Sequence, residues 1–135
     1  MSIDIENELF TRIAIAVRLA YPEAYVVGEY VSQPARFPAV FIVEQDNSVY
    51  QSGRDSGDIE NYAEVAYQVD VYSNRNVGKK SECKAIMAII DAQFAQLGFT
   101  RTFLNPVQNM DNPEIYRMTG VFRAVVSKDH YIYRR

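Results

Sequence analysis

The sequence predicts an α+β fold in which two α-helices cover one face of a mostly antiparallel β-sheet, in the chain order α-β-β-β-α-β-β. Three observations predict this class. Residues 2–20 and 77–97 repeat apolar side chains at the three- and four-residue steps of amphipathic helices. The segments between and after them alternate apolar and polar residues, as strands do when one sheet face is covered. The helices stand singly between runs of strands, an order typical of helices packed on one face of a single sheet.

The composition is that of one ordinary globular domain spanning residues 1–135. Hydrophobic residues make up 48% and charged residues 23% of the chain, and its length suffices to bury a core. No apolar run approaches the ~20 residues of a membrane-spanning helix. The first residues, MSIDIENELF, lack the basic region of a secretory signal. We therefore expect no membrane contact, and a location in the cytoplasm of the producing cell or in a particle assembled there.

The ends of the two predicted helices follow from their capping residues. Helix 2–20 begins after Ser2 or Asp4, either of which can accept a capping hydrogen bond, and it ends before Pro22. Gly98 suits the position that ends helix 77–97, because glycine adopts a left-handed backbone without strain. The candidates for capping the start of this second helix are the polar residues Ser73, Asn74 and Asn76.

Two short strands, 24–31 and 37–45, are predicted after the first helix. The second of them is apolar on both faces, with Val40 and Ile42 on one face and Phe41 on the other. A strand of this kind lies either centrally under two layers or beneath another subunit. Val40 and Ile42 are for this reason candidates for a subunit interface.

Residues 46–60, DNSVYQSGRDSGDIE, break the pattern and predict a long flexible loop. Gly, Ser, Asp and Asn dominate the segment, and it is long for a connection inside a compact domain. Two interpretations stand beside each other: an exposed hairpin tip, or an arm that orders against a neighbouring subunit or partner. Under the second interpretation the interface candidates are Tyr50, Arg54, Asp55 and Asp58.

Four further strands are predicted at 62–72, 99–107, 114–126 and 130–134. On the strand 114–126, Arg117 and Arg123 share the face opposite the apolar residues. If this strand pairs with 62–72, the two arginines can face Glu64 and Asp70 across the ladder. Arg117 and Arg123 complete the set of interface candidates.

The stretch SNRNVGKKS, residues 73–81, has the strand–loop–helix setting of a phosphate-binding loop. A loop of that kind needs GxxxxGK followed directly by Ser or Thr. Here Ser73 occupies the first glycine position, and Lys80 stands where the hydroxyl is required. We therefore predict a connection between a strand and a helix, with no nucleotide site and no cofactor.

No set of residues predicts catalysis or metal binding. His130 is the only histidine, which argues against a zinc site or a Ser–His–acid triad. Cys83 is the only cysteine, and its helical spacing with Ile86 and Ile90 predicts a buried structural thiol. The net charge of −3 argues against a nucleic-acid-binding surface. Ten tyrosines instead favour a protein that makes protein–protein contacts, and we expect no enzyme.

The second half of the chain carries a resemblance to a known family. The runs YQVDVYSNRNVGKKSECKAIMAIIDAQFAQLGFTRT and PVQNMDNPEIYRMTGVFRAVVSKDHYIYRR contain three features. These are a DVYSN turn after an alternating strand, a helix that closes on LGF, and an IYR…G.FR..V strand before a short aromatic and basic end. Over residues 62–135 the chain resembles the tail terminator (tail completion) proteins of long-tailed bacteriophages and prophages. The N-terminal half agrees with that family in layout only.

The resemblance implies a virion structural protein assembled in the host cytoplasm. Subunits of that family close into a six-fold ring that caps the head-proximal end of the tail tube and stops its polymerisation. The partners are therefore further copies of the chain, the tail tube protein and a head-completion or neck protein, while DNA passes through the lumen without specific binding. Two alternatives remain open: a head–tail connector or stopper protein, and a small cytoplasmic α+β enzyme or ligand-binding domain.

Overall fold

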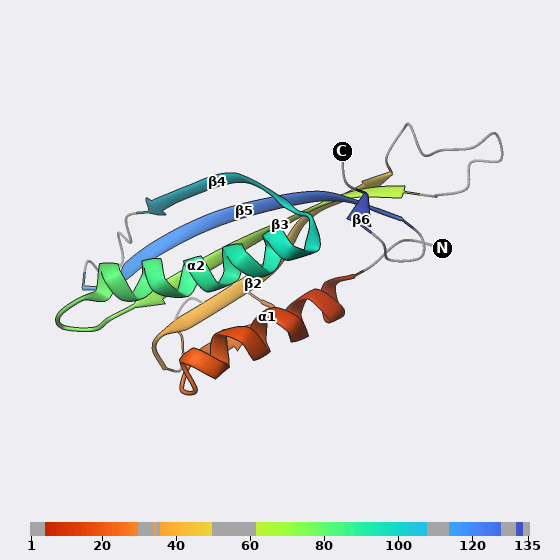
Figure 1. Ribbon diagram of the computed structural model, residues 1–135. Helices are drawn as coiled ribbons and strands as arrows, with labels where there is room; N and C mark the ends of the chain where they lie inside the picture. The colour runs from red at the N-terminus through yellow and green to blue at the C-terminus, as the bar shows by residue number, and fades with distance from the viewer. Residues whose placement is uncertain are drawn as a thin grey trace, which may run out of the picture.

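The computed structural model describes residues 5–29, 34, 36–49, 62–107, 114–127 and 132–133. In chain order its elements are α1 (Glu6–Ala20), β1 (Tyr25–Val27), β2 (Ala39–Val49), β3 (Tyr62–Ser73), α2 (Lys79–Leu97), β4 (Thr100–Val107), β5 (Tyr116–Ser127) and β6 (Ile132–Tyr133). The strands form one six-stranded sheet in the order β1-β2-β3-β5-β4, with β6 paired to β5 (Figure 1). All pairs are antiparallel except β1 with β2. The predicted α+β class and element order are confirmed.

Both helices lie on one face of the sheet and run in opposite directions (Figure 1). They contact each other through Arg12 of α1, whose guanidinium donates to the side-chain oxygens of Gln93 (2.9 Å) and Gln96 (3.0 Å) of α2. Aromatic packing joins α2 to the sheet, since the rings of Phe94 and Phe122 stack with centroids 4.1 Å apart. The predicted two-layer arrangement is therefore the one observed.

The apolar faces predicted for the central strands are the faces that the helices cover. On β3 the five alternating residues are all 0% exposed: Ala63, Val65, Tyr67, Val69 and Val71. The neighbouring strand β5, which pairs with β3, contributes Met118, Phe122, Ala124 and Val126 to the same core. The helices contribute a stripe each, which includes Ile13 and Val17 of α1 and Ile86 and Ile90 of α2. Helix and strand periodicity therefore predicted the core correctly.

Strand β2 is longer than predicted. It continues through Val49, so residues 46–49 belong to the sheet and not to a loop. The ladder with β3 shifts between Glu44 and Asp46, which leaves Gln45 as a bulge. A bulge disturbs the two-residue alternation, so the alternation of apolar and polar residues ended the predicted strand at residue 45. The remaining part of the predicted loop, residues 50–60, lies outside the described residues.

The start of α2 also differs from the prediction. The residue that precedes its first turn is Gly78, with φ 85°, and no side chain caps the helix. Ser73, one of the three predicted caps, instead donates its hydroxyl to Glu82 (2.7 Å) and accepts from the amide of Arg75. The five-residue connection 74–78 thus turns the chain through the left-handed glycine. Ser2 and Asp4, predicted to cap α1, lie outside the described residues.

Candidate functional site

The sheet has a second face, turned away from the helices, which we call the open face. Alternation along the strands places on it these residues of β2, β3 and β5: Phe41, Val43, Asp46, Glu64, Gln68, Asp70, Tyr72, Arg117, Thr119, Val121 and Arg123. No described helix covers this face (Figure 1). A sheet face of this kind either meets water or docks against a partner.

The centre of the open face is a hydrogen-bonded network around Asp70. This carboxylate is 3% exposed. Its Oδ1 accepts from Nε (3.2 Å) and Nη2 (3.1 Å) of Arg117 and from the hydroxyl of Thr119. Its Oδ2 accepts from the amide of Gln68 (3.1 Å). Charge-assisted bonds of this number satisfy the buried carboxylate and fix the position of the arginine.

Arg123 forms a second, looser group on the same face. Its Nη1 lies 3.9 Å from Asp46 Oδ2 and 3.9 Å from Glu64 Oε1. The side chains of all three residues are between 39% and 47% exposed. Asp46 reaches this face only because the bulge at Gln45 shifts the alternation of β2. The predicted pairing of the two arginines with Glu64 and Asp70 across the ladder is confirmed.

One end of the open face carries an aromatic cluster. Phe41 and Tyr72 pack edge to face with centroids 5.2 Å apart. Tyr25, Phe37 and Ile115 pack around them. The guanidinium carbon of Arg117 lies 5.5 Å from the centroid of the Tyr72 ring, so the same arginine joins the cluster to the Asp70 network. Aromatic rings and arginine beside them are the residue types enriched at protein–protein contacts.

The structure divides the predicted interface candidates into three groups. Arg117 and Arg123 lie on the open face, as described above. Val40 and Ile42 are 0% and 1% exposed in the core beneath the helices, so their side chains present no surface to another subunit. This corrects their selection as interface residues: the face opposite Phe41 is covered by the chain's own helices. Tyr50, Arg54, Asp55 and Asp58 lie outside the described residues.

Sequence reasoning missed several exposed apolar side chains. Ile15 and Leu19 of α1 are 57% and 81% exposed, Val77 in the β3–α2 connection is 83% exposed, and Phe103 of β4 is 41% exposed. Val77 follows Asn74, Arg75 and Asn76 in the turn, and an apolar residue at such a position is the one signal that the sequence offered.

The described residues hold no arrangement typical of catalysis. Burial, with a smaller contribution from neighbouring Glu82, raises the pKa of Cys83 to about 12, so the thiol stays protonated at neutral pH. Its sulfur lies 3.6 Å from the carbonyl oxygens of Val71 and Tyr116, between α2 and the sheet. The predicted buried thiol is confirmed. Within the described ranges, no three His, Cys, Asp or Glu side chains are grouped to hold a metal ion. His130 lies outside those ranges.

Among the helices that the structure describes, neither is long and apolar enough to cross a membrane.

The fold is shared with a solved virion component. The chain is similar to one chain of the structure described as the virion of a native gene transfer agent (GTA) particle, with a TM-score of 0.61 and 14% sequence identity. The match covers 90% of this chain and 91% of the other, so it includes nearly the whole of both folds. No protein-family model matches the sequence, and no curated protein matches it either. At 14% identity the likeness concerns the fold.

Proposed function

We propose that this protein is a phage virion structural protein, specifically a tail terminator that forms a six-fold ring on the head-proximal end of the tail tube. The observation that carries the proposal is the fold likeness to a chain of a GTA virion over nine-tenths of both chains. The resemblance of residues 62–135 to tail terminators points the same way, and it supplies the finer role. The ring acts by binding surfaces alone, without catalysis or a cofactor.

The surface described above suits this role. The open face combines an aromatic cluster with paired charges, and such a mixture suits a docking surface that must be soluble before assembly and specific after it. One side of the ring covers the last layer of tube subunits and thereby blocks further addition. The other side receives the head-completion or neck protein. The net charge of −3 suits a lumen through which DNA passes without specific binding.

The test is to mix the purified protein with tail tubes and to measure mass by light scattering and tube ends by negative-stain imaging. We expect a ring of 15.4 kDa subunits at one end of each tube, and tubes that stop growing. A protein that ignores tubes but binds DNA-filled heads would instead identify the connector or stopper alternative. A persistent monomer that binds neither would contradict a virion role.

Two variants make the test specific for the open face. Arg123→Glu places a third negative charge beside Asp46 and Glu64, and we expect it to leave the ring intact while weakening the capping of tubes or the docking of the neck. Arg101→Glu is the matched control, because Arg101 lies on the helix side of the sheet, 3.3 Å from Asp91 of α2. If both variants cap tubes equally well, the open face is not part of the docking surface.

A further inference from the structure

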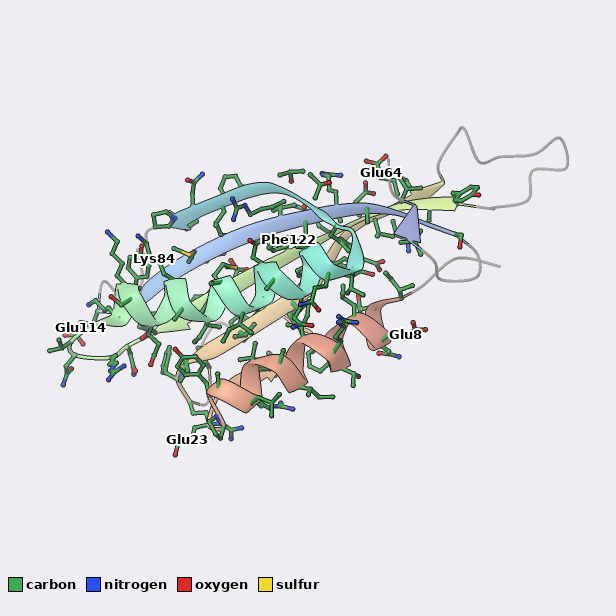
Figure 2. The ribbon with its side chains drawn as sticks, viewed as in Figure 1. Glu8, Glu23, Glu64, Lys84, Glu114 and Phe122 are labelled. Atoms are coloured by element: carbon green, nitrogen blue, oxygen red, sulfur yellow. The ribbon has the colours of Figure 1, made fainter. Side chains whose placement is uncertain are left out.

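The sheet has two edges at which a further strand can be added. The strand order places β4 at one edge and β1 with β2 at the other (Figures 1 and 2). Strand β1 pairs only with residues 39–41 of β2, and no strand that the structure describes lies beside residues 42–46 on that side. An edge strand presents amide and carbonyl groups to which another chain can bond. Each subunit therefore offers two different edges to a neighbour.

The strands at these two edges run in opposite directions. Strand β2 is antiparallel to β3, β3 is antiparallel to β5, and β5 is antiparallel to β4. If two copies are related by a rotation that keeps their strands aligned, β4 of one copy meets β2 of the next in antiparallel orientation. The alternation of strand directions then continues from one subunit into the next, in the arrangement with the better hydrogen-bond geometry.

The stretches of the two edges that can pair lie at the same level of the sheet. When the strand partners are followed across β3 and β5, the row that begins at Asp46 ends at Thr100. The other rows follow in order, so residues 42–46 of β2 are level with residues 100–104 of β4. A neighbour that continues the sheet thus meets β4 where the edge of β2 has room for a strand.

The remaining parts of the two edges also correspond. Residues 39–41 of β2 are covered by β1, and the residues of β4 in the same rows are 105–107. This part of β4 contains Pro106, which has no amide hydrogen to donate. The proline therefore lies level with the part of β2 that is already paired, and it leaves the pairing of residues 100–104 undisturbed.

One row of the open face has an apolar side chain at each edge. By register, Val43 at the edge of β2 and Phe103 at the edge of β4 lie in the same row. Phe103 is 41% exposed and Val43 is half-buried. Aromatic and β-branched side chains stabilise a ladder when they stand opposite each other. The side chain of Arg101, also on β4, lies on the helix side and bonds Asp91 of its own subunit at 3.3 Å.

Bulges keep both edges from forming a long regular ladder. The register shifts at Gln45 in β2 and at Thr102 in β4. Natural sheets use edge bulges and prolines to prevent indiscriminate pairing with other chains. The main chain alone therefore provides a short contact, and the packing of Phe103 adds to it.

We propose that β4 of one copy adds to the edge of β2 of the next copy, with residues 100–104 antiparallel to residues 42–46 and Phe103 against Val43. The proposal rests on the ring assembly proposed above and identifies the contact between its subunits. A closed ring requires two different and complementary patches on each subunit. The two edges meet this requirement, because they lie on opposite sides of one sheet and their strands run in opposite directions.

The first test is cross-linking between two single-cysteine variants, Thr100→Cys and Asp46→Cys. Both positions are exposed, and the substitutions leave Phe103 and Val43 in place. Side chains opposite each other across a ladder lie about 5 Å apart and diagonal ones about 7–8 Å apart, so a thiol-specific linker of about 10 Å reaches either. The buried Cys83 does not compete. We expect a covalent dimer in the mixture at a yield at least tenfold above that of either variant alone.

A matched control separates edge pairing from random collision. Ala88→Cys introduces an exposed thiol on α2, in the helix layer. Mixed with Asp46→Cys, it should give only background cross-linking. Circular dichroism of each variant checks that the fold is kept.

Two further measurements address the main chain and the side chain separately. Amide hydrogen exchange compares the ring with the free subunit, and we expect the amides of residues 100–104 that point away from β5 to exchange at least tenfold more slowly in the ring. Phe103→Asp should weaken association at least tenfold, measured by sedimentation velocity. Its control is Val77→Asp, which changes another exposed apolar residue, in the β3–α2 connection.

The outcomes distinguish this contact from the function on which it rests. Rings that cap tubes but give neither the cross-link nor slower exchange at residues 100–104 would overturn the contact and leave the terminator function standing. Equal association of Phe103→Asp and Val77→Asp, or equal cross-linking with Ala88→Cys, would also overturn the contact. A strong cross-link in a protein that never caps tubes would retain the contact and overturn the terminator function.

Discussion

Asp70 shows at the scale of one residue how the open face is held together. Its carboxylate is buried, yet it accepts hydrogen bonds from Arg117, Thr119 and Gln68. The alternation of β3 brings an acid to this face, and the alternation of β5 brings Thr119 opposite it and Arg117 diagonally across from it. The resulting pair then orients Arg117 over the ring of Tyr72, which ties the polar centre to the aromatic cluster.

We expect Asp70→Ala to lower the free energy of unfolding by about 3 kcal/mol, because it leaves the partly buried Arg117 without its charge partner. The measurement is urea denaturation followed by circular dichroism. Asp91→Ala is the matched control: it breaks the exposed pair with Arg101 and should lower stability by less than about 1 kcal/mol. Equal losses in the two variants would show that burial adds nothing to the Asp70 network.

Cys83 gives a second prediction at this scale, for alkaline pH. Burial raises its pKa from 9.0 to about 12, so the folded state holds the thiol proton more tightly than the unfolded chain does. The contribution of the protonated Cys83 thiol to the free energy of unfolding is fully present below pH 9. It is lost as the pH rises toward about 12. Denaturation of the protein and of Cys83→Ala across this range should show a steeper loss in the protein with cysteine. Parallel curves would contradict the raised pKa.

At the scale of elements, α2 begins and ends at glycines with left-handed backbones. Gly78 has φ 85° and Gly98 has φ 92°. At the carboxyl end, the amide of Gly98 donates to Ala95 and that of Phe99 donates to Phe94, a Schellman arrangement that satisfies two of the last carbonyls. This closure directs Phe99 back against Phe94 and Tyr67, and it sets the point where β4 leaves the helix.

We expect Gly98→Ala to lower the free energy of unfolding by about 1–2 kcal/mol, since a side chain opposes the left-handed backbone. Gly28→Ala is the control. A Cβ at that position would lie 3.8 Å from Phe10 Cδ2, an ordinary contact, and no positive φ is required there. Thermal denaturation of both variants gives the comparison, and an unaffected Gly98→Ala would contradict the role of the turn.

At the scale of the whole molecule, the two helices differ in the charges at their amino ends. The helices run side by side along the sheet, and their amino ends lie at opposite ends of the subunit (Figure 1). The amino end of α1 carries Glu6 and Glu8, and that of α2 carries Lys79 and Lys80. The two helix starts therefore differ in charge, although Glu82 also lies in the first turn of α2.

We expect the association of subunits to weaken by about tenfold as salt rises from about 0.05 M to about 0.5 M, because screening shortens the reach of exposed charges below 10 Å. Sedimentation velocity at fixed protein concentration measures the change. The variant Lys80→Gln/Lys84→Gln should associate more weakly at low salt and respond less to added salt. Association that is insensitive to salt in the unmodified protein would show that exposed charges contribute little to the contact between copies.

The sequence by itself determined which faces of the helices and strands are apolar. Periodicity placed Val65 and Val69 on an apolar face, and the backbone freedom of glycine assigned Gly98 to the end of α2, because each of these depends on near neighbours along one element. The facing of Arg117 and Asp70 was predicted only on the condition that their two strands pair. The buried state of Cys83 followed from the same spacing.

Only the tertiary structure decided where the elements meet and where local rules fail. The bulge at Gln45 depends on the register between β2 and β3, so no pattern within β2 predicted that Asp46 would join Arg123. The burial of Val40 depended on which face of β2 the helices cover. The parallel pairing of β1, only three residues long, with β2 was likewise not predicted from the sequence. Such features come from contacts between segments distant in the chain, and these are set by packing of the whole domain.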